Sequence, residues 1–150
     1  MWVPFQLSRS RIVAIKGHEN DPFVVTSTAD IARVIRLAIK YEKERPEIGG
    51  FSGNRLSPRQ LKKLAQKVQG RAIKLELVHE SDLAAGVLRV DMPQIVHASI
   101  PEEQRLAWHV PVWIGLLSAI SMGAWDVSDE WKERLPDYKF LTVEEYLKAL

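Results

Sequence analysis

Apolar positions recur every three to four residues over one long stretch of this chain, and this helical periodicity is its clearest structural pattern. The stretch runs from Phe23 to Arg45, begins as a short β-branched strand that enters the helix, and carries basic side chains on the other face of that helix. Ser27 and Asp30 form an S-x-x-D capping box where the helix begins, and Pro46 disfavours helical backbone at the preceding residue. The pattern predicts a helix to about Arg45 whose buried face consists of Ile31, Val34, Ile35, Ala38 and Ile39.

Alternating apolar and polar residues predict short strands elsewhere in the chain. Residues 73–78, I-K-L-E-L-V, show this alternation. Residues 11–16, R-I-V-A-I-K, are also expected to form a short strand, and a turn-rich connection follows them. The segment E-I-G-G-F-S-G-N at 47–54 is also expected to form a brief strand, because a short glycine-rich strand fits closely between its neighbours. The chain therefore alternates strands with helices, which favours an α/β fold.

Capping residues mark further helices. Ser57 opens the sequence S-P-R-Q, which supplies a cap and a first-turn proline, and Gly70 stands where such a helix ends. Residues 81–99 have helical periodicity that Pro93 interrupts, so we expect a kinked or broken helix there. A T-x-x-E box at 142–145 predicts a terminal helix.

The segment from Leu106 to Trp125 is the most apolar part of the chain, and His109 is its only ionisable residue. Its length reaches the minimum of about 20 residues for a membrane span. Proline, glycine and serine residues dilute its hydrophobicity, so a buried or partner-facing helix is the favoured interpretation and a membrane span the disfavoured one.

Composition narrows the function classes. The 150 residues are enough for a single domain, and 21 basic residues against 19 acidic ones leave a charge of +2 without a basic stripe for nucleic acid. The absence of cysteine excludes disulfides, thiolate zinc sites and cysteine nucleophiles. No signal-peptide pattern is present at the start, so a cytoplasmic location is expected.

Motifs for catalysis or metal binding are absent from the sequence. No two of the four histidines have helical ligand spacing, no serine lies in a G-x-S-x-G turn, and no tyrosine precedes a lysine by four positions. Gly49, Gly50 and Gly53 are spaced G-G-x-x-G, which differs from the dinucleotide-binding pattern and favours a structural role. Asp30 is better explained as a helix cap than as a catalytic acid.

The order of several motifs resembles the carboxy-terminal half of the NmrA-like and isoflavone-reductase-like proteins, a branch of the atypical short-chain dehydrogenase/reductases. The motifs are T-S-T-A-D-I-A-R at 26–33, G-F-S-G-N-R-L-S-P-R-Q-L at 50–61, Q-G-R at 69–71 and F-L-T-V-E-E-Y-L at 140–147. The resemblance covers nearly all of this chain but only about the second half of the family's length. It implies a partial Rossmann-type fold, made of late strands and helices, with a mostly helical substrate-binding lobe.

The resemblance also implies a function. Complete relatives transfer hydride between NADP or NAD and a small apolar or aromatic substrate, through a glycine-rich cofactor turn and catalytic residues that have no counterpart here. This chain is therefore expected to bind substrate without binding cofactor or catalysing the reaction alone. The expected substrate-lining residues are Trp108, Trp113, Met122 and Trp125.

An alternative interpretation uses the same aromatic residues. In this interpretation they pack in a core or contact another chain. The protein would then be a non-catalytic regulatory or protein-interaction module that docks through the Trp-rich apolar helix. The helix would then contact either a second copy of this chain, in a homo-oligomer, or another protein.

Overall fold

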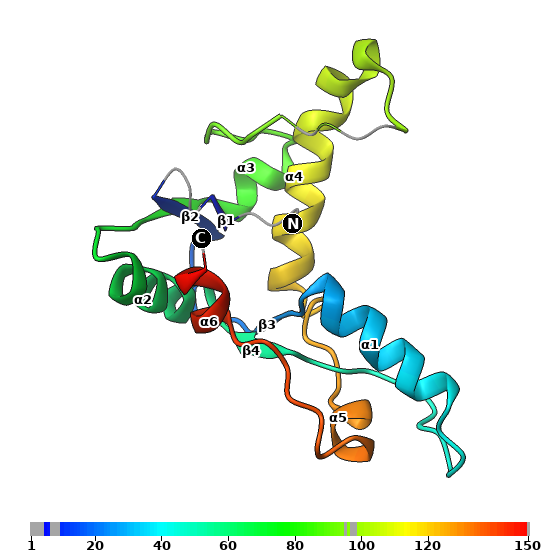
Figure 1. Ribbon diagram of the computed structural model, residues 1–150. Helices are drawn as coiled ribbons and strands as arrows, with labels where there is room; N and C mark the ends of the chain where they lie inside the picture. The colour runs from blue at the N-terminus through cyan, green and yellow to red at the C-terminus, as the bar shows by residue number, and fades with distance from the viewer. Residues whose placement is uncertain (1–4, 7–9, 95, 97–98, 150) are drawn as a thin grey trace.

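The computed structural model describes residues 5–6, 10–94, 96 and 99–149, and it shows a mixed α/β protein with two small sheets (Figure 1). One sheet has the order β1-β2-β5, with β1 (Phe5–Gln6) antiparallel to β2 (Arg11–Ile15) and β2 parallel to β5 (Lys74–Val78). The other pairs β3 (Phe23–Val25) with β4 (Asn54–Leu56) in antiparallel orientation. The predicted strands at the positions of β2 and β5 are thus confirmed.

Helices separate and cover these strands (Figure 1). In the described part of the chain they are α1 (Thr28–Ile39), α2 (Pro58–Gln69), α3 (Glu80–Ala84), the 3₁₀ helix η2 (Glu102–Gln104), α4 (Arg105–Ser121), α5 (Glu130–Arg134) and α6 (Val143–Lys148). Among the described residues, no helix is both long enough and apolar enough to cross a membrane. The longest, α4, has 17 residues and contains Pro111.

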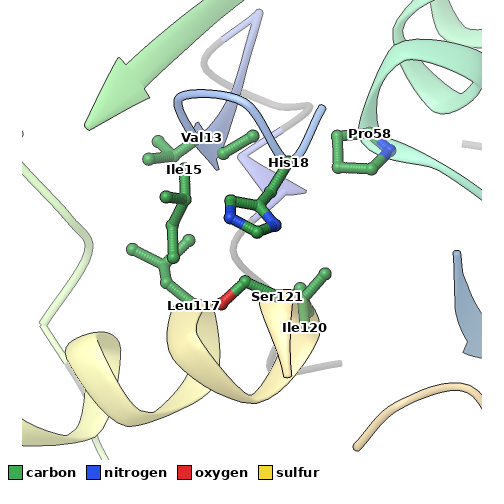
Figure 2. Close-up of a pocket in the computed structure, with 8 residues that line it drawn as sticks. Val13, Ile15, His18, Pro58, Leu117, Ile120 and Ser121 are labelled. Carbon is green, nitrogen blue, oxygen red and sulfur yellow. The ribbon is translucent and has the colours of Figure 1, made fainter. Parts of the chain in front are cut away.

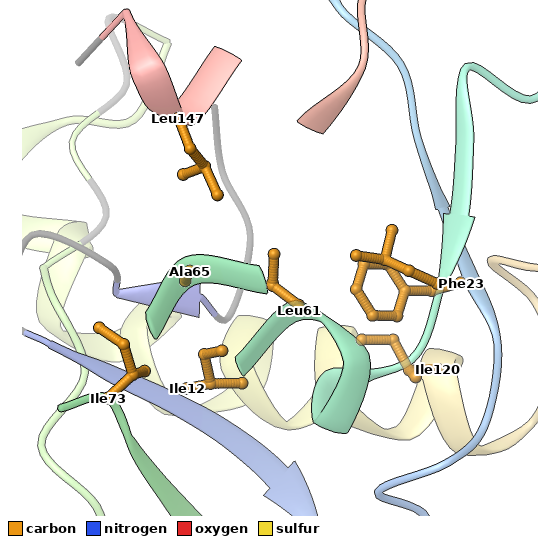
Figure 3. Packing of buried hydrophobic residues seen from close by; sticks show 8 residues of the cluster. Ile12, Phe23, Leu61, Ala65, Ile73, Ile120 and Leu147 are labelled. Atoms are coloured by element: carbon orange, nitrogen blue, oxygen red, sulfur yellow. The ribbon is translucent and has the colours of Figure 1, made fainter. Parts of the chain in front are cut away.

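Two apolar clusters form the core on opposite sides of β2. Ile12 belongs to the cluster beneath α2 and α6, whereas Val13 and Ile15 belong to the cluster against α4. Because successive side chains of a strand point to opposite faces, β2 is buried on both of its faces. Figure 3 shows the first cluster, which consists of Ile12, Phe23, Leu56, Leu61, Ala65, Ile73, Ile120 and Leu147.

The predicted caps of α2 and α6 are confirmed. Ser57 Oγ accepts a hydrogen bond from the Gln60 N–H at 3.3 Å, and Gln60 Oε1 accepts one from the Ser57 N–H at 2.8 Å. Gly70 ends α2 in the left-handed region with φ 64°. Thr142 and Glu145 form the same reciprocal box at the start of α6. These local motifs therefore act as predicted.

The first helix is shorter than predicted. It ends at Ile39 rather than near Arg45, and Arg45 donates a hydrogen bond from its guanidinium to the Ile39 carbonyl oxygen. Leaving the helix lets Tyr41 pack edge-on against Trp131, with the ring centroids 5.4 Å apart. A long-range aromatic contact and a side-chain cap thus replace the last turns of the predicted helix.

The prediction that the apolar face of α1 is buried is also mostly wrong for the described part of the chain. Val34 is buried, but Ile31, Ile35 and Ile39 are 37%, 50% and 71% exposed. The apolar residues do lie at helical spacing on one side of the helix. No described element covers most of that side.

Two further expectations need correction. Residues 47–53 are irregular and the strand begins only at Asn54, because acidic side chains near α5 bind the backbone N–H groups of this loop. The helix expected at 81–99 is reduced to α3, since Gly86 adopts φ 74° and the Val87 N–H turns back to the Asp82 carbonyl oxygen. Ile95, which belonged to that expected helix, lies outside the described residues.

Candidate functional site

The four aromatic and apolar residues expected to line a substrate pocket lie in different surroundings. Trp113 is fully buried in the second core cluster, where its Nε1 donates to the Pro93 carbonyl oxygen at 3.0 Å. Trp108 is half-exposed in the first half of α4, and Met122 is exposed directly after its end. Trp125 packs against the first core cluster and also lines an open groove. Of the four, Trp125 therefore defines the candidate site.

This groove, called the apolar groove below, is formed by segments from four regions of the chain. Its volume is about 370 Å³, within the range of roughly 300–1,000 Å³ that small-molecule sites occupy. None of its lining side chains is ionisable. They are Val24, Thr26, Ile31, Phe51, Ala124, Trp125 and Val127. The lining suits an uncharged apolar or aromatic group and lacks the side chains for acid–base catalysis.

One wall of the groove comes from the turn after α4. Gly123 adopts φ 74°, a conformation that glycine takes without strain, and so redirects the chain at the helix end. The Val24 N–H then donates to the Trp125 carbonyl oxygen at 2.8 Å. The next residue, Asp126, forms an ion pair with Arg55 on β4. These contacts hold Trp125 beside the small β3–β4 sheet.

The opposite wall carries Phe51 from the glycine-rich loop. A Cβ atom on Gly50 would lie 2.7 Å from the Ser128 carbonyl oxygen, and one on Gly53 would lie 3.0 Å from that of Val25. The backbone approach at Gly50 excludes a side chain, and a side chain at Gly53 would require the neighbouring backbone to shift. The structural interpretation of these glycines is confirmed.

Acidic side chains accept hydrogen bonds from backbone N–H groups of this loop. The Gly49 N–H donates to Glu130 Oε2 at 2.6 Å, and the Ser52 N–H donates to Asp129 Oδ1 at 3.1 Å. A dinucleotide pyrophosphate needs such N–H groups free and carries negative charge itself. The loop therefore does not fit NAD or NADP.

Thr26 supplies the polar side chain of the groove. Its Oγ1 accepts a hydrogen bond from the Gly53 N–H at 3.0 Å. A hydroxyl also carries one hydrogen to donate, and no acceptor for it is found among the described residues. A ligand with a hydrogen-bond acceptor beside its apolar part would match this arrangement.

A hydrogen-bonded carboxylate lies next to the groove at the start of α1. Asp30 is 3% exposed and accepts hydrogen bonds from Tyr138 Oη at 2.6 Å, Ser27 Oγ at 2.7 Å and the Leu141 N–H at 3.1 Å. We call these four residues the Asp30 cluster. Burial acts to raise the pKa of Asp30, but these hydrogen bonds and the charge of Arg33 hold that pKa below its usual value. Burial and the contact with Asp30 raise the pKa of Tyr138.

The Asp30 cluster stabilises the fold and offers no proton for chemistry at neutral pH. The lowered pKa keeps its carboxylate ionised, and three donors take three of its roughly four acceptor positions. Ser27 is the N-cap of α1 and accepts a hydrogen bond from the Asp30 N–H at 3.0 Å, so half of the predicted capping box is present. The Asp30 carboxylate accepts from the Ser27 hydroxyl instead of the Ser27 backbone N–H, and it also fixes the chain at Tyr138 and Leu141. The second role involves residues 108 and 111 positions away and has no local sequence pattern.

A second hollow lies between β2 and α4 and contains His18 and Ser121 (Figure 2). His18 Nδ1 lies 2.6 Å from Asp21 Oδ2, so the residue types of a hydrolytic triad are close together. The hydroxyl of Ser121, however, donates to the Ser118 carbonyl oxygen at 3.0 Å. The hollow measures about 10 Å³, roughly the space of one water molecule. It has no room for a substrate carbonyl.

The described part of the chain contains no candidate metal-binding site. No group of three or more histidine, aspartate or glutamate side chains is placed there to hold a metal ion. His97, one of the histidines considered from the sequence, lies outside the described residues.

Comparison with known proteins gave no assignment. No family model matched the chain, and no curated protein or solved structure matched it significantly.

Proposed function

We propose that this chain is the substrate-binding, carboxy-terminal portion of an NmrA-like NAD(P)-dependent oxidoreductase, and that the apolar groove receives its substrate. The observation that carries the proposal is a groove of about 370 Å³ beside Trp125 whose lining contains no ionisable side chain. Such a lining favours a small, uncharged apolar or aromatic substrate. The ordered motifs between Thr26 and Leu147 supply the link to the family.

The topology supports the fold included in this proposal. Strands β2 and β5 are parallel and adjacent, and the connection between them contains β3, α1, β4 and α2, of which α2 packs against the first core cluster. A parallel pair joined through a helix is the unit from which Rossmann-type sheets are built. The proposal therefore includes a partial Rossmann-type fold and the cytoplasmic location expected from the sequence.

In this proposal, substrate binding is separate from cofactor binding and catalysis. The groove binds and orients the substrate, whereas NAD or NADP and the catalytic acid–base groups belong to complete relatives. The side chains that line the groove include no acid–base group, since their N–H and O–H groups are those of Trp125 and Thr26, and the glycine-rich loop does not accept a pyrophosphate. The chain alone should bind substrate without converting it.

Binding of a neutral aromatic fluorophore, N-phenyl-1-naphthylamine, tests the proposal. We expect saturable binding of the probe to the 150-residue chain. The rise in probe fluorescence measures this binding. Ile31→Glu places a charge in the groove and should weaken binding at least about tenfold, because burying the carboxylate or displacing the probe is costly.

Ile35→Glu is the matched control. Ile35 lies one turn further along α1, is more exposed than Ile31 and does not line the groove. Its substitution should leave the dissociation constant within about twofold of wild type. Equal effects of the two substitutions, or no saturable binding to wild type, would contradict the proposal.

The second candidate function is a protein-interaction module. It is favoured by the exposure of Leu106 and Trp108 at the beginning of α4, which leaves two large apolar side chains in contact with water. A second copy of this chain is the simplest partner to test, by light scattering. Self-association that Leu106→Glu removes would support this candidate, and a strictly monomeric species at high concentration would contradict it.

A further inference from the structure

The Phe51 wall of the apolar groove is connected by ring contacts to the Asp30 cluster. Phe51 stacks on Phe140, with centroids 6.4 Å apart and planes inclined by 20°. Phe140 in turn packs edge-on against Tyr138, with centroids 4.8 Å apart and planes inclined by 82°. Both separations lie within the range of attractive aromatic pairs. Tyr138 Oη then donates to the buried carboxylate of Asp30.

A further side of the groove, formed by Ile31, begins at the same carboxylate. Ile31, which lines the groove, directly follows Asp30 at the start of α1. The Leu141 N–H also donates to Asp30, so two hydrogen bonds fix both ends of the short segment that carries Phe140. Two sides of the groove are therefore held in relation to each other by one carboxylate.

Phe51 depends on this support more than the rest of its loop does. The backbone of the loop is held by Asp129 and Glu130, whereas the Phe51 ring is partly exposed and stacks on Phe140. Loss of the contact from Tyr138 would free the ring without releasing the loop. The effect should fall on the shape of the groove and much less on the stability of the fold.

We propose that the Tyr138 hydroxyl is a positioning group for ligand binding: by hydrogen bonding to Asp30 it holds Phe140 against Phe51 and fixes the wall of the apolar groove. This inference rests on the proposed function of the groove. Tyr138 itself does not line the groove and is not expected to touch the ligand.

Tyr138→Phe tests this role because it removes the hydroxyl and keeps the ring that packs against Phe140. We expect the dissociation constant of N-phenyl-1-naphthylamine to rise roughly three- to tenfold, the loss associated with one hydrogen bond. Tyr146→Phe is the matched control, since Tyr146 is exposed on α6 and loses the same hydroxyl. Its dissociation constant should equal that of wild type.

A double-mutant cycle separates positioning from a general loss of stability. Phe140→Leu should weaken probe binding to a similar extent, and the double variant Tyr138→Phe/Phe140→Leu should be no weaker than Phe140→Leu alone, because both act through one contact. Dissociation constants are measured well below the melting temperature of each variant. A purely structural role would lower the melting temperature and leave the dissociation constant unchanged.

The outcomes distinguish this inference from the function on which it rests. Wild-type binding that Ile31→Glu weakens, together with unchanged binding by Tyr138→Phe, would overturn the positioning role and leave the groove in place. Additive effects in the double variant would also overturn it. Absence of saturable binding to wild type would overturn the proposed function and this inference with it.

Discussion

Helices α1 and α2 have nearly the same local design but differ in what covers them. Each has 12 residues, begins with a serine cap and carries an apolar stripe on one side. On α2 that stripe is buried against the sheet and α6, with Leu61 and Ala65 in the first core cluster. On α1 the isoleucines face outward, beside the apolar groove. An amphipathic pattern thus specifies a helix without specifying what covers its apolar face.

The largest expected difference between the two helices is in stability. Leu61→Ala on α2 should lower the free energy of unfolding by about 2–4 kcal/mol, because it removes buried methyl groups and leaves a cavity. Ile35→Ala on α1 should change it by less than about 1 kcal/mol, since that side chain is already half-exposed. Urea-induced unfolding measures both values. Equal losses would show that the α1 face is covered in solution.

A smaller difference concerns pH. The Ser27 cap of α1 is bonded to a carboxylate, whereas the Ser57 cap of α2 is bonded to the amide of Gln60. The folded pKa of Asp30 lies below its ordinary value of 3.8, so its contribution to stability is complete above that value. This contribution is lost as pH falls through the folded pKa.

Thermal unfolding of wild type and Asp30→Asn across acid pH isolates this effect. Glu19, Glu144 and Glu145 also have lowered pKa values, so wild-type stability falls for several reasons. The difference between the two proteins should be largest near neutral pH and shrink below about pH 4. A difference that stays constant with pH would contradict the assigned role of the carboxylate.

The sequence predicted what depends on neighbouring residues. The serine and threonine caps, the glycine that ends α2 and the short strands at the positions of β2 and β5 all follow from local patterns, and the structure confirms them. The end of α1 was predicted wrongly because Tyr41 leaves the helix to reach Trp131, a contact that no local pattern encodes.

The candidate site was harder to predict for the same reason. Trp125 was identified as a lining residue, but Phe51 and Ile31 were assigned to a strand and to a buried helix face. The groove depends on contacts such as that between Ser52 and Asp129, which are 77 positions apart. Periodicity detects the apolar residues of such a site but not which of them meet.

The most direct test of the account maps the ligand onto the two helices by heteronuclear NMR, with N-phenyl-1-naphthylamine added stepwise to the isotopically labelled chain. Saturable chemical-shift changes are expected at Thr26, Ile31, Phe51 and Trp125, and none along α2. Changes centred on the exposed beginning of α4, at Leu106 and Trp108, or scattered over the whole chain would contradict the account.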